Sequence, residues 1–492
     1  MTISRSSYLS AALFLAFALG LRAQDTQPGA GAVNLPVCGG SPGFDDTPGL
    51  INIIKNSTMN TFFVSPLQPC YVHFTGANGL PAGTRLVGTL GRSVLRLFTA
   101  SDNLLSIGKS DITIEGLTLD NPFSSITGYH GVLIWVNAQG FRLIHNKITS
   151  SAEGGSTGTA VWAWNSNVDI ESNEVTDFGT QIKITATPGK EPRVRIIGNR
   201  LHDNNAGGGN GIVIASDNSS TKSDIPTAIE GNYIWNISAS ASSSGQNGNG
   251  VDLDHANNVR IANNHAKNVR FSCWRAFSSD SLLAEGNHCS DAGETGGYSE
   301  FNSLHNQWVN NYFDNIASGC LSLANADVGG QYHTAIGNHM VGCGGTGIQA
   351  EAATIVEGNM IDQASTGMLL GYGSYGQHVI ARDNYIMDTS GQNKTVRGIG
   401  IESHTSGDMD VEGNKIVLPA HQIEATAWGS TDGTGALPAT VQIRDQEIPF
   451  AMLGVAANGS YVYCPDCQVG PVCAGGGQGA FAKRLQNIWI CQ

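Results

Sequence analysis

A short pattern of alternating apolar and polar positions recurs along most of the chain. Each copy ends in an asparagine that is followed closely by another apolar position, as in IESNEV, IEGNYI and VEGNKI. The asparagines of the eleven copies are Asn146, Asn173, Asn199, Asn232, Asn264, Asn287, Asn311, Asn338, Asn359, Asn384 and Asn414. Neighbouring copies lie 21 to 33 residues apart, a period that indicates a repeat architecture with one structural unit per copy.

A second alternating segment precedes most of these asparagines by about a dozen residues, for example GVLIWV, GIVIAS and GVDLDH. The longer repeats carry their extra residues in Gly-, Ser- and Asn-rich pieces such as 238–250, as expected for loops inserted into otherwise equal units. Two or more short strands per repeat, without a helical period, predict an all-β parallel solenoid in which each repeat is one coil.

The repeated asparagine has a structural explanation. Asparagine tolerates the left-handed backbone conformation of a tight corner, and its side-chain amide can hydrogen-bond to the same amide in the next coil. Eleven catalytic copies are not credible, so we interpret these asparagines as scaffold.

These motifs resemble those of the pectate-lyase-like superfamily of right-handed parallel β-helices, over roughly residues 45–430. FDDTPGLINIIKN resembles the short capping helix that begins many extracellular members, and PAGTRLVGTLGRSVLRL with DITIEGLTLDN resembles their first coils. More narrowly, LPAGTRLVG, GYSEFNS and GIQAEAATIVEGN are similar to a family of exported bacterial repeat proteins with no assigned reaction. The resemblance implies a right-handed parallel β-helix and leaves the chemistry to individual side chains.

The start of the chain predicts export. Arg5 precedes an apolar run from Ala11 to Leu21 and a polar stretch, which is typical of a signal peptide over residues 1–23. The run is too short for a comfortable membrane span and no later run reaches eighteen apolar residues, so we expect a secreted or periplasmic bacterial protein. Three further regions are expected: an N-terminal cap with the first coil (24–90), the β-helix (91–430) and a Cys-rich C-terminal module (431–492).

The charge of the chain limits its partners. Its formal net charge is −14, and loss of Arg5 and Arg22 with the signal peptide makes it −16. An acidic surface disfavours nucleic acid and other polyanionic partners, because the binding of phosphate or uronate groups gains most from a basic patch. The sequence leaves a monomer and a homotrimer open.

Ten cysteines in an exported chain favour disulfides. Cys38 and Cys70 flank the predicted capping helix and are expected to staple it. For the coil cysteines, buried thiols and disulfides both remain open; these are Cys273, Cys289, Cys320 and Cys343. The last four begin with Cys-x-x-Cys, but their further spacing does not repeat that pair, so two disulfides are favoured over zinc; they are Cys464, Cys467, Cys473 and Cys491.

Outward residues on one sheet of a solenoid stack into a stripe with rungs about 4.8 Å apart. Aligning the second segments of the repeats places Leu133, Trp135, Trp162 and Trp164 at its upstream end. Exposed tryptophans are suited to stacking on sugar rings. The alternative is that a loop, 121–129 or 152–158, folds over them as a satellite core.

Further along the stripe lie the candidate catalytic carboxylates Asp252, Asp254 and Glu300. The first two share a face with Cα atoms about 6.5–7 Å apart, and Glu300 lies two rungs on, about 10 Å away. Glycoside hydrolysis needs one protonated and one ionised carboxyl group, and crowding of like charges would raise one pKa. Alternatively, Asp252, Arg275 and Glu300 form a charge ladder without catalytic function.

A polysaccharide lyase is the second hypothesis. It would use Ca²⁺ held by carboxylates against a uronate, with Lys183 or Arg275 removing the proton; the hydrolase needs no cofactor and no metal. His255 and Tyr298 complete the candidate substrate-binding residues, although a turn histidine is more often incidental. A third reading is a glycan-binding or structural protein without catalysis. We predict a carbohydrate-active protein acting on a polysaccharide, with hydrolysis of a neutral or weakly charged glycan as the first expectation.

Overall fold

The computed structural model describes residues 31–492 except 205–207, 240–246, 324–327, 372–377, 393, 396, 402–408, 418–440, 445–449, 454–460 and 487. The predicted signal peptide and the predicted boundary at residue 430 lie outside the described residues. The limits of the predicted regions therefore stay predictions.

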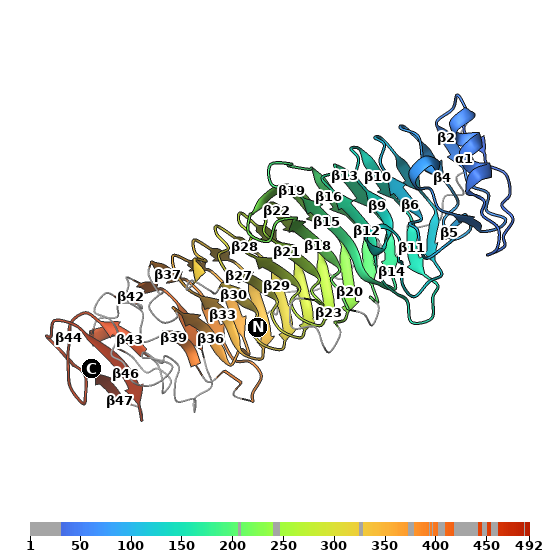
Figure 1. Cartoon of the computed structure of the whole chain (residues 1–492). Helices are drawn as coiled ribbons and strands as arrows, with labels where there is room; N and C mark the ends of the chain where they lie inside the picture. Colours follow the sequence, from blue (N-terminus) through green and yellow to red (C-terminus); the bar gives the residue numbers. More distant parts are fainter. Residues whose placement is uncertain are drawn as a thin grey trace.

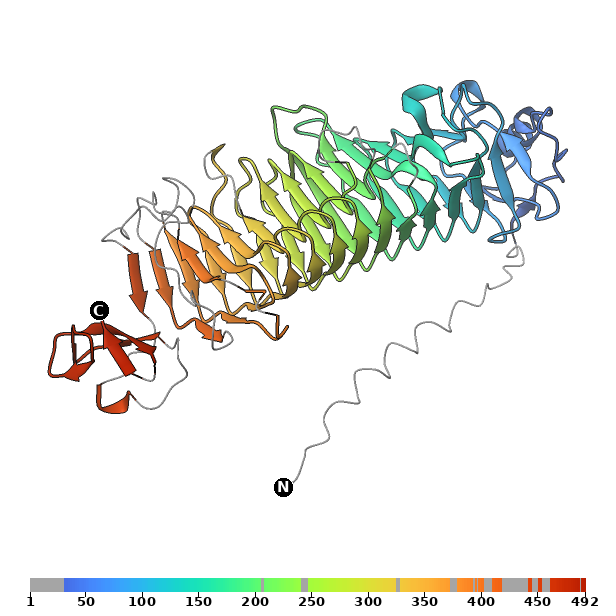
Figure 2. The same ribbon diagram turned by 90° about the horizontal axis from the view of Figure 1, so that it is seen from below.

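The described chain is a right-handed parallel β-solenoid of about 13 coils, as the repeats predicted. The coils stack along one axis into an elongated body (Figures 1 and 2). Most coils contribute one strand to each of three parallel sheets. Sheet A has 16 strands, from β1 (Val33–Asn34) to β42 (Val441–Arg444), and sheet B has 14, from β3 (Cys70–Val72) to β41 (Lys415–Val417).

Sheet C has 12 strands and carries the residues singled out by the sequence. Its strands are β6 (Leu105–Ile107), β9 (Val132–Val136), β12 (Ser156–Trp164), β15 (Phe178–Ala186), β18 (Ile212–Ser216), β21 (Val251–Asp254), β24 (Trp274–Phe277), β27 (Gly297–Glu300), β30 (Leu321–Leu323), β33 (Thr346–Ala350), β36 (Thr366–Leu370) and β39 (Arg397–Ile401).

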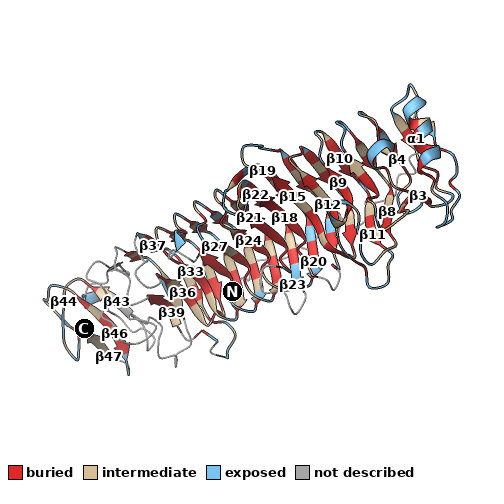
Figure 3. Ribbon diagram, in the orientation of Figure 1, coloured by how far each residue is buried: buried red, intermediate tan, exposed pale blue. Residues whose placement is uncertain are grey.

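Alternation along the strands builds a continuous apolar core inside the coils. On β15, for example, Ile182 and Ile184 are fully buried while Lys183 between them is partly exposed. Figure 3 shows the same alternation of buried and less buried positions along the solenoid. Burial of apolar surface is the main driving force for stacking the coils.

The repeated asparagines form a buried hydrogen-bonded ladder, as predicted. The amide of Asn146 donates to Oδ1 of Asn173 at 3.1 Å, and the same bond recurs from coil to coil as far as Asn414. The expected left-handed backbone, however, belongs to the residue before the asparagine, for example Gly198 (φ 64°) and Gly231 (φ 61°). The residue before the asparagine, often glycine, thus adopts the left-handed conformation of the corner, and the asparagine supplies the hydrogen bonds between coils.

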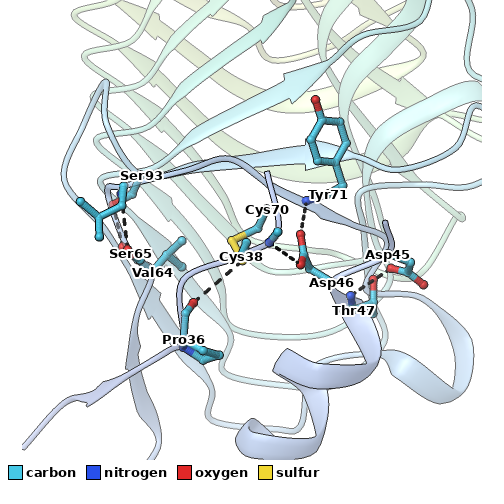
Figure 4. The surroundings of a disulfide bond; sticks show 12 residues. Pro36, Cys38, Asp45, Asp46, Thr47, Val64, Ser65, Cys70, Tyr71 and Ser93 are labelled. Carbon is cyan, nitrogen blue, oxygen red and sulfur yellow. Dashed lines mark hydrogen bonds between the residues drawn. A yellow bond between two sulfur atoms is a disulfide. The ribbon is translucent and has the colours of Figure 1, made fainter. Parts of the chain in front are cut away.

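An N-terminal cap closes one end of the solenoid. Helix α1 (Thr47–Asn56) is the predicted capping helix, and it buries Leu50, Ile51 and Ile54 against the first coils. Cys38 and Cys70 form the expected disulfide. Beside it, the Asp46 carboxylate accepts hydrogen bonds from the backbone N–H groups of Gly39 and Tyr71 (Figure 4).

The remaining eight cysteines are also paired. The coil cysteines form Cys273–Cys289 and Cys320–Cys343, so the disulfide alternative holds and the buried-thiol reading is wrong. The tail forms Cys464–Cys467 and Cys473–Cys491 within a small antiparallel sheet of β43 (Tyr461–Cys464), β46 (Ala480–Leu485) and β47 (Ile488–Cys491). Among the described residues, no helix has the length and hydropathy needed to cross a membrane.

Candidate functional site on sheet C

The outward face of sheet C carries two parallel rows of side chains, here called the outward stripe. The first row is Ser106, Trp135, Trp162, Lys183, Val213, Asp252, Arg275, Tyr298, Ser322, Gln349 and Leu369. The second row contains Trp164, Thr185, Ala215, Asp254, Phe277 and Glu300. The predicted register is therefore correct from Trp162 onward. In the strand before it, Trp135 pairs with Trp162 and not with Trp164, and Leu133, expected on this face, is fully buried in the core.

At the upstream end, a loop covers part of the tryptophan surface. Tyr129 and His130 belong to η2 (Tyr129–Gly131), and the His130 ring lies 4.5 Å from that of Trp135 and 4.8 Å from that of Trp162. Trp135 is only 7% exposed, whereas Trp162 and Trp164 remain partly exposed with stacked rings 6.2 Å apart. Both sequence alternatives hold in part, because the loop buries one tryptophan and leaves two accessible.

Lys183 connects this aromatic cluster to the acidic part of the stripe. Its Nζ lies 4.1 Å from the Trp162 ring centre, a cation–π contact. Burial lowers the pKa of Lys183, and the nearby Asp254 carboxylate opposes this effect. Burial and the Lys183 charge both lower the pKa of His130, whose backbone is in the left-handed region (φ 60°).

Asp252, Arg275 and Glu300 form a buried ion-pair network. Arg275 Nη1 lies 3.0 Å from Asp252 Oδ1, and Arg275 Nε lies 2.8 Å from Glu300 Oε2. Asn210 donates to the other oxygen of Asp252 at 3.1 Å. The Arg275 side chain is 2% exposed, and those of Asp252 and Glu300 are 9% and 10% exposed. The three side chains therefore make the ion pairs of the charge-ladder alternative, and the Arg275 side chain is almost fully buried between the two acids.

Burial also controls the protonation of these acids. It raises the pKa of Asp252 to about 6, and the Arg275 charge acts in the opposite direction. The pKa of Glu300 is raised as well, again by burial and against Arg275. Both changes follow from the cost of holding a carboxylate out of water.

Asp254 is the exposed carboxylate of the three, with 45% of its side chain accessible. His255 Nδ1 lies 2.6 Å from Asp254 Oδ1. The ring of Phe277 packs edge-on against the His255 ring at 5.4 Å, and Phe301 packs against Phe277 at 4.5 Å. The histidine is thus held by a carboxylate on one side and an aromatic ring on the other, which is an arrangement for a positioned acid–base group.

The structure places Tyr298, the last predicted binding residue, beside Arg275 in the first row, where it is partly exposed. The sequence analysis named Tyr129 at the end of a possible covering loop, but it missed His130 and Phe301 as neighbours of the stripe. The motif TGYHG directly before the Trp135 strand was the available signal, because an aromatic pair in a polar loop needs an apolar surface to cover.

The sequence left Ca²⁺ possible for a lyase, but few carboxylates of the outward stripe are free to hold it. Calcium takes six to eight oxygen ligands, while Arg275 already holds Asp252 and Glu300, leaving Asp254 as the exposed carboxylate. Within the described part of the chain, the groups of three potential ligands closest together are both at the tail cysteines, and those cysteines are in disulfides. We therefore derive no step that uses a metal ion.

No protein-family model matches the sequence, and no curated protein matches it. Solved structures do match, including a PL6 alginate lyase in complex with a trisaccharide (12% identity, 84% of this chain and 93% of that chain, TM-score 0.47). Others are PfbA, a surface adhesin of Streptococcus pneumoniae (13% identity, 94% and 99%, TM-score 0.46), and the Dettilon tailspike protein (14% identity, 80% and 74%, TM-score 0.44). The likeness concerns the parallel β-helix fold alone; the narrower resemblance to an exported bacterial family stays a prediction.

Proposed function

We propose that the protein binds an extracellular polysaccharide along the outward stripe and cleaves it at uronate residues by β-elimination. The observation that carries this proposal is the arrangement along one face of Lys183, which contacts the partly exposed ring of Trp162, and the hydrogen-bonded Asp254–His255 pair further along the stripe. Three rungs separate β12 from β21, about 14 Å, which accommodates a short run of sugar rings.

Each of these groups has a role in the reaction. The Trp162 face stacks on the apolar side of a sugar ring. The Lys183 ammonium pairs with the uronate carboxylate and makes the adjacent C–H more acidic. His255, oriented by Asp254, takes that proton. The released electron pair forms a carbon–carbon double bond, and the glycosidic oxygen leaves with its bonding pair and is protonated by water.

This role of Asp254 and His255 differs from the hydrolase expected first. A hydrolase needs two carboxyl groups that both reach the glycosidic bond, whereas Asp252 and Glu300 are engaged by Arg275. One observation favours hydrolysis as the second candidate: the pKa of Asp252, raised to about 6, suits a general acid. Binding without cleavage is the remaining outcome.

The test is to incubate the purified mature protein with a panel of polyuronates and neutral polysaccharides, with and without added calcium. Reducing ends and the ultraviolet absorbance of unsaturated products are followed in parallel. The proposal predicts that both signals rise together on a polyuronate and that both are lost in Lys183→Met. Reducing ends without the absorbance would establish the hydrolase instead, and silence across the panel with retained binding would establish a binder.

A further inference from the structure

A pocket of about 690 Å³ lies at the N-terminal end of the outward stripe. Ser106 and Trp135, the first members of the first row, form part of its wall together with Asn137. Its other side is formed by the cap: Lys55 at the end of α1 and the segment around η1 (Gly76–Asn78). Its volume is typical of small-molecule sites, and the stripe leads directly into it.

The charge of this pocket is opposite to that of the protein. Lys55 and Lys109 both line it, and none of the described residues in its wall is an aspartate or a glutamate. The whole chain carries a net charge of −14, so two cations in a wall that contains no acid make a local site for an anion. The Lys55 ammonium donates to the carbonyl oxygen of Ala77, which fixes it between the helix and the η1 segment.

The pocket wall also provides a surface for a sugar ring. Trp135, which is only 7% exposed, contributes a small aromatic surface, while Ser106 and Asn137 contribute groups that can hydrogen-bond to hydroxyls. A wall that mixes apolar and polar groups and carries two cations is complementary to a sugar that bears a carboxylate. The cap segment closes the stripe beyond this point.

From these observations we infer that the pocket is a subsite for an acidic sugar at one end of the bound chain, with its carboxylate held by Lys55 and Lys109. The inference rests on the proposed uronate substrate, but it concerns residues distinct from Lys183, Asp254 and His255. When the pocket is occupied, the polysaccharide has a fixed position along the stripe. Cleavage then releases fragments whose length is set by the distance from the pocket.

The test is calorimetric titration with trimers of galacturonate, guluronate and mannuronate, and with the methyl-esterified form of each trimer as the uncharged comparison. The double variant Lys55→Gln/Lys109→Gln is compared with Lys267→Gln, which removes an exposed lysine from sheet B. We expect at least one acid trimer to bind, the double variant to weaken that binding about tenfold or more, and Lys267→Gln to bind normally. The esterified trimer should bind the wild type and the double variant equally.

Unchanged affinity of the double variant for the acid trimer would overturn the inference, as would failure of the wild type to bind any of the acid trimers. The two proposals fail separately. If trimer binding depends on Lys55 and Lys109 but no polymer is cleaved, the acidic-sugar subsite stands and the lyase proposal fails. If the polymer is cleaved but trimer binding does not depend on these lysines, the lyase proposal stands and the subsite fails.

Discussion

The Nδ1 atom of His255 forms a hydrogen bond of 2.6 Å with the Oδ1 atom of Asp254, the last residue of β21. Because the carboxylate occupies one ring nitrogen, the other nitrogen is the one that can exchange a proton with a substrate. This hydrogen bond makes His255 the base in the proposed elimination.

Replacing that base should affect the rate far more than the fold. We expect His255→Gln to reduce turnover of a polyuronate by about 10²–10⁴-fold, the usual contribution of a positioned acid–base group. Affinity for the polymer should change little. Asp224→Asn, an exposed acid on sheet A, is the control, and steady-state kinetics with circular dichroism is the measurement. Equal rates for His255→Gln and the wild type would exclude the histidine as base.

The tryptophan face can be tested with a matched residue on another sheet. Trp162→Ala should weaken polymer binding about tenfold, since loss of a stacking ring costs about 0.5–1.5 kcal/mol beyond its buried area. Trp235→Ala, on β20 (Tyr233–Ile237) of sheet B, removes the same ring type from a different face and should bind normally. Affinity electrophoresis in gels containing the polymer compares the two. A larger loss for Trp235→Ala would move the binding surface to sheet B.

The buried network predicts a stability effect at Arg275. Arg275→Met leaves Asp252 and Glu300 buried without their counter-charge, so the free energy of unfolding should fall by about 3–5 kcal/mol. The partly exposed pair of Arg142 and Asp169 is the control, and Arg142→Met should cost about 1 kcal/mol or less. Guanidinium denaturation followed by circular dichroism measures both. Similar costs for the two variants would contradict a buried network.

A stack of imidazole rings on sheet B predicts sensitivity to acid. The rings of His265 and His288 lie 4.4 Å apart and nearly parallel, and each leaves its Nε2 atom buried without a hydrogen-bond partner. Burial lowers the pKa of His265 to about 4 and also lowers that of His288.

The folded-state pKa values of both rings lie below the ordinary value of 6.5, so the unfolded chain takes up protons at a higher pH than the folded protein does. The free energy of unfolding therefore falls as the pH drops from 6.5 toward the folded-state pKa, which is about 4 for His265. His265→Phe keeps an aromatic ring in the stack but cannot titrate. Over that range its melting temperature should fall less than that of the wild type, while the two remain similar at neutral pH. If the melting temperatures of His265→Phe and the wild type fall by the same amount over this range, the stack does not govern stability in acid.

The ladder of asparagines and the register of the stripe could be predicted from the sequence because both follow from periodicity. One Asn per coil fixes the stacking of coils, and alternation along each strand then fixes which residues face outward, including Glu300 two rungs from Asp254. The position of Leu133 escaped this rule because Leu133 and the next residue, Ile134, both lie in the core, so that strict alternation does not hold there.

The behaviour of the stripe residues could not be predicted in the same way. Whether Arg275 would reach a substrate or fold between Asp252 and Glu300 depends on side-chain conformation and on burial, which periodicity does not specify. The cover supplied by His130, and the pocket between Lys55 and Trp135, depend on contacts between the loops or cap and the coils. Such contacts leave no regular pattern in the sequence.

The mass of the products distinguishes elimination from hydrolysis. Elimination gives new non-reducing ends that are lighter by one water than the ends produced by hydrolysis, so mass spectrometry of fragments from a cleaved polyuronate separates the two reactions. We expect unsaturated fragments whose formation requires His255 and Lys183. Fully hydrated fragments, lost in Asp252→Asn and retained in His255→Gln, would contradict it and identify a hydrolase.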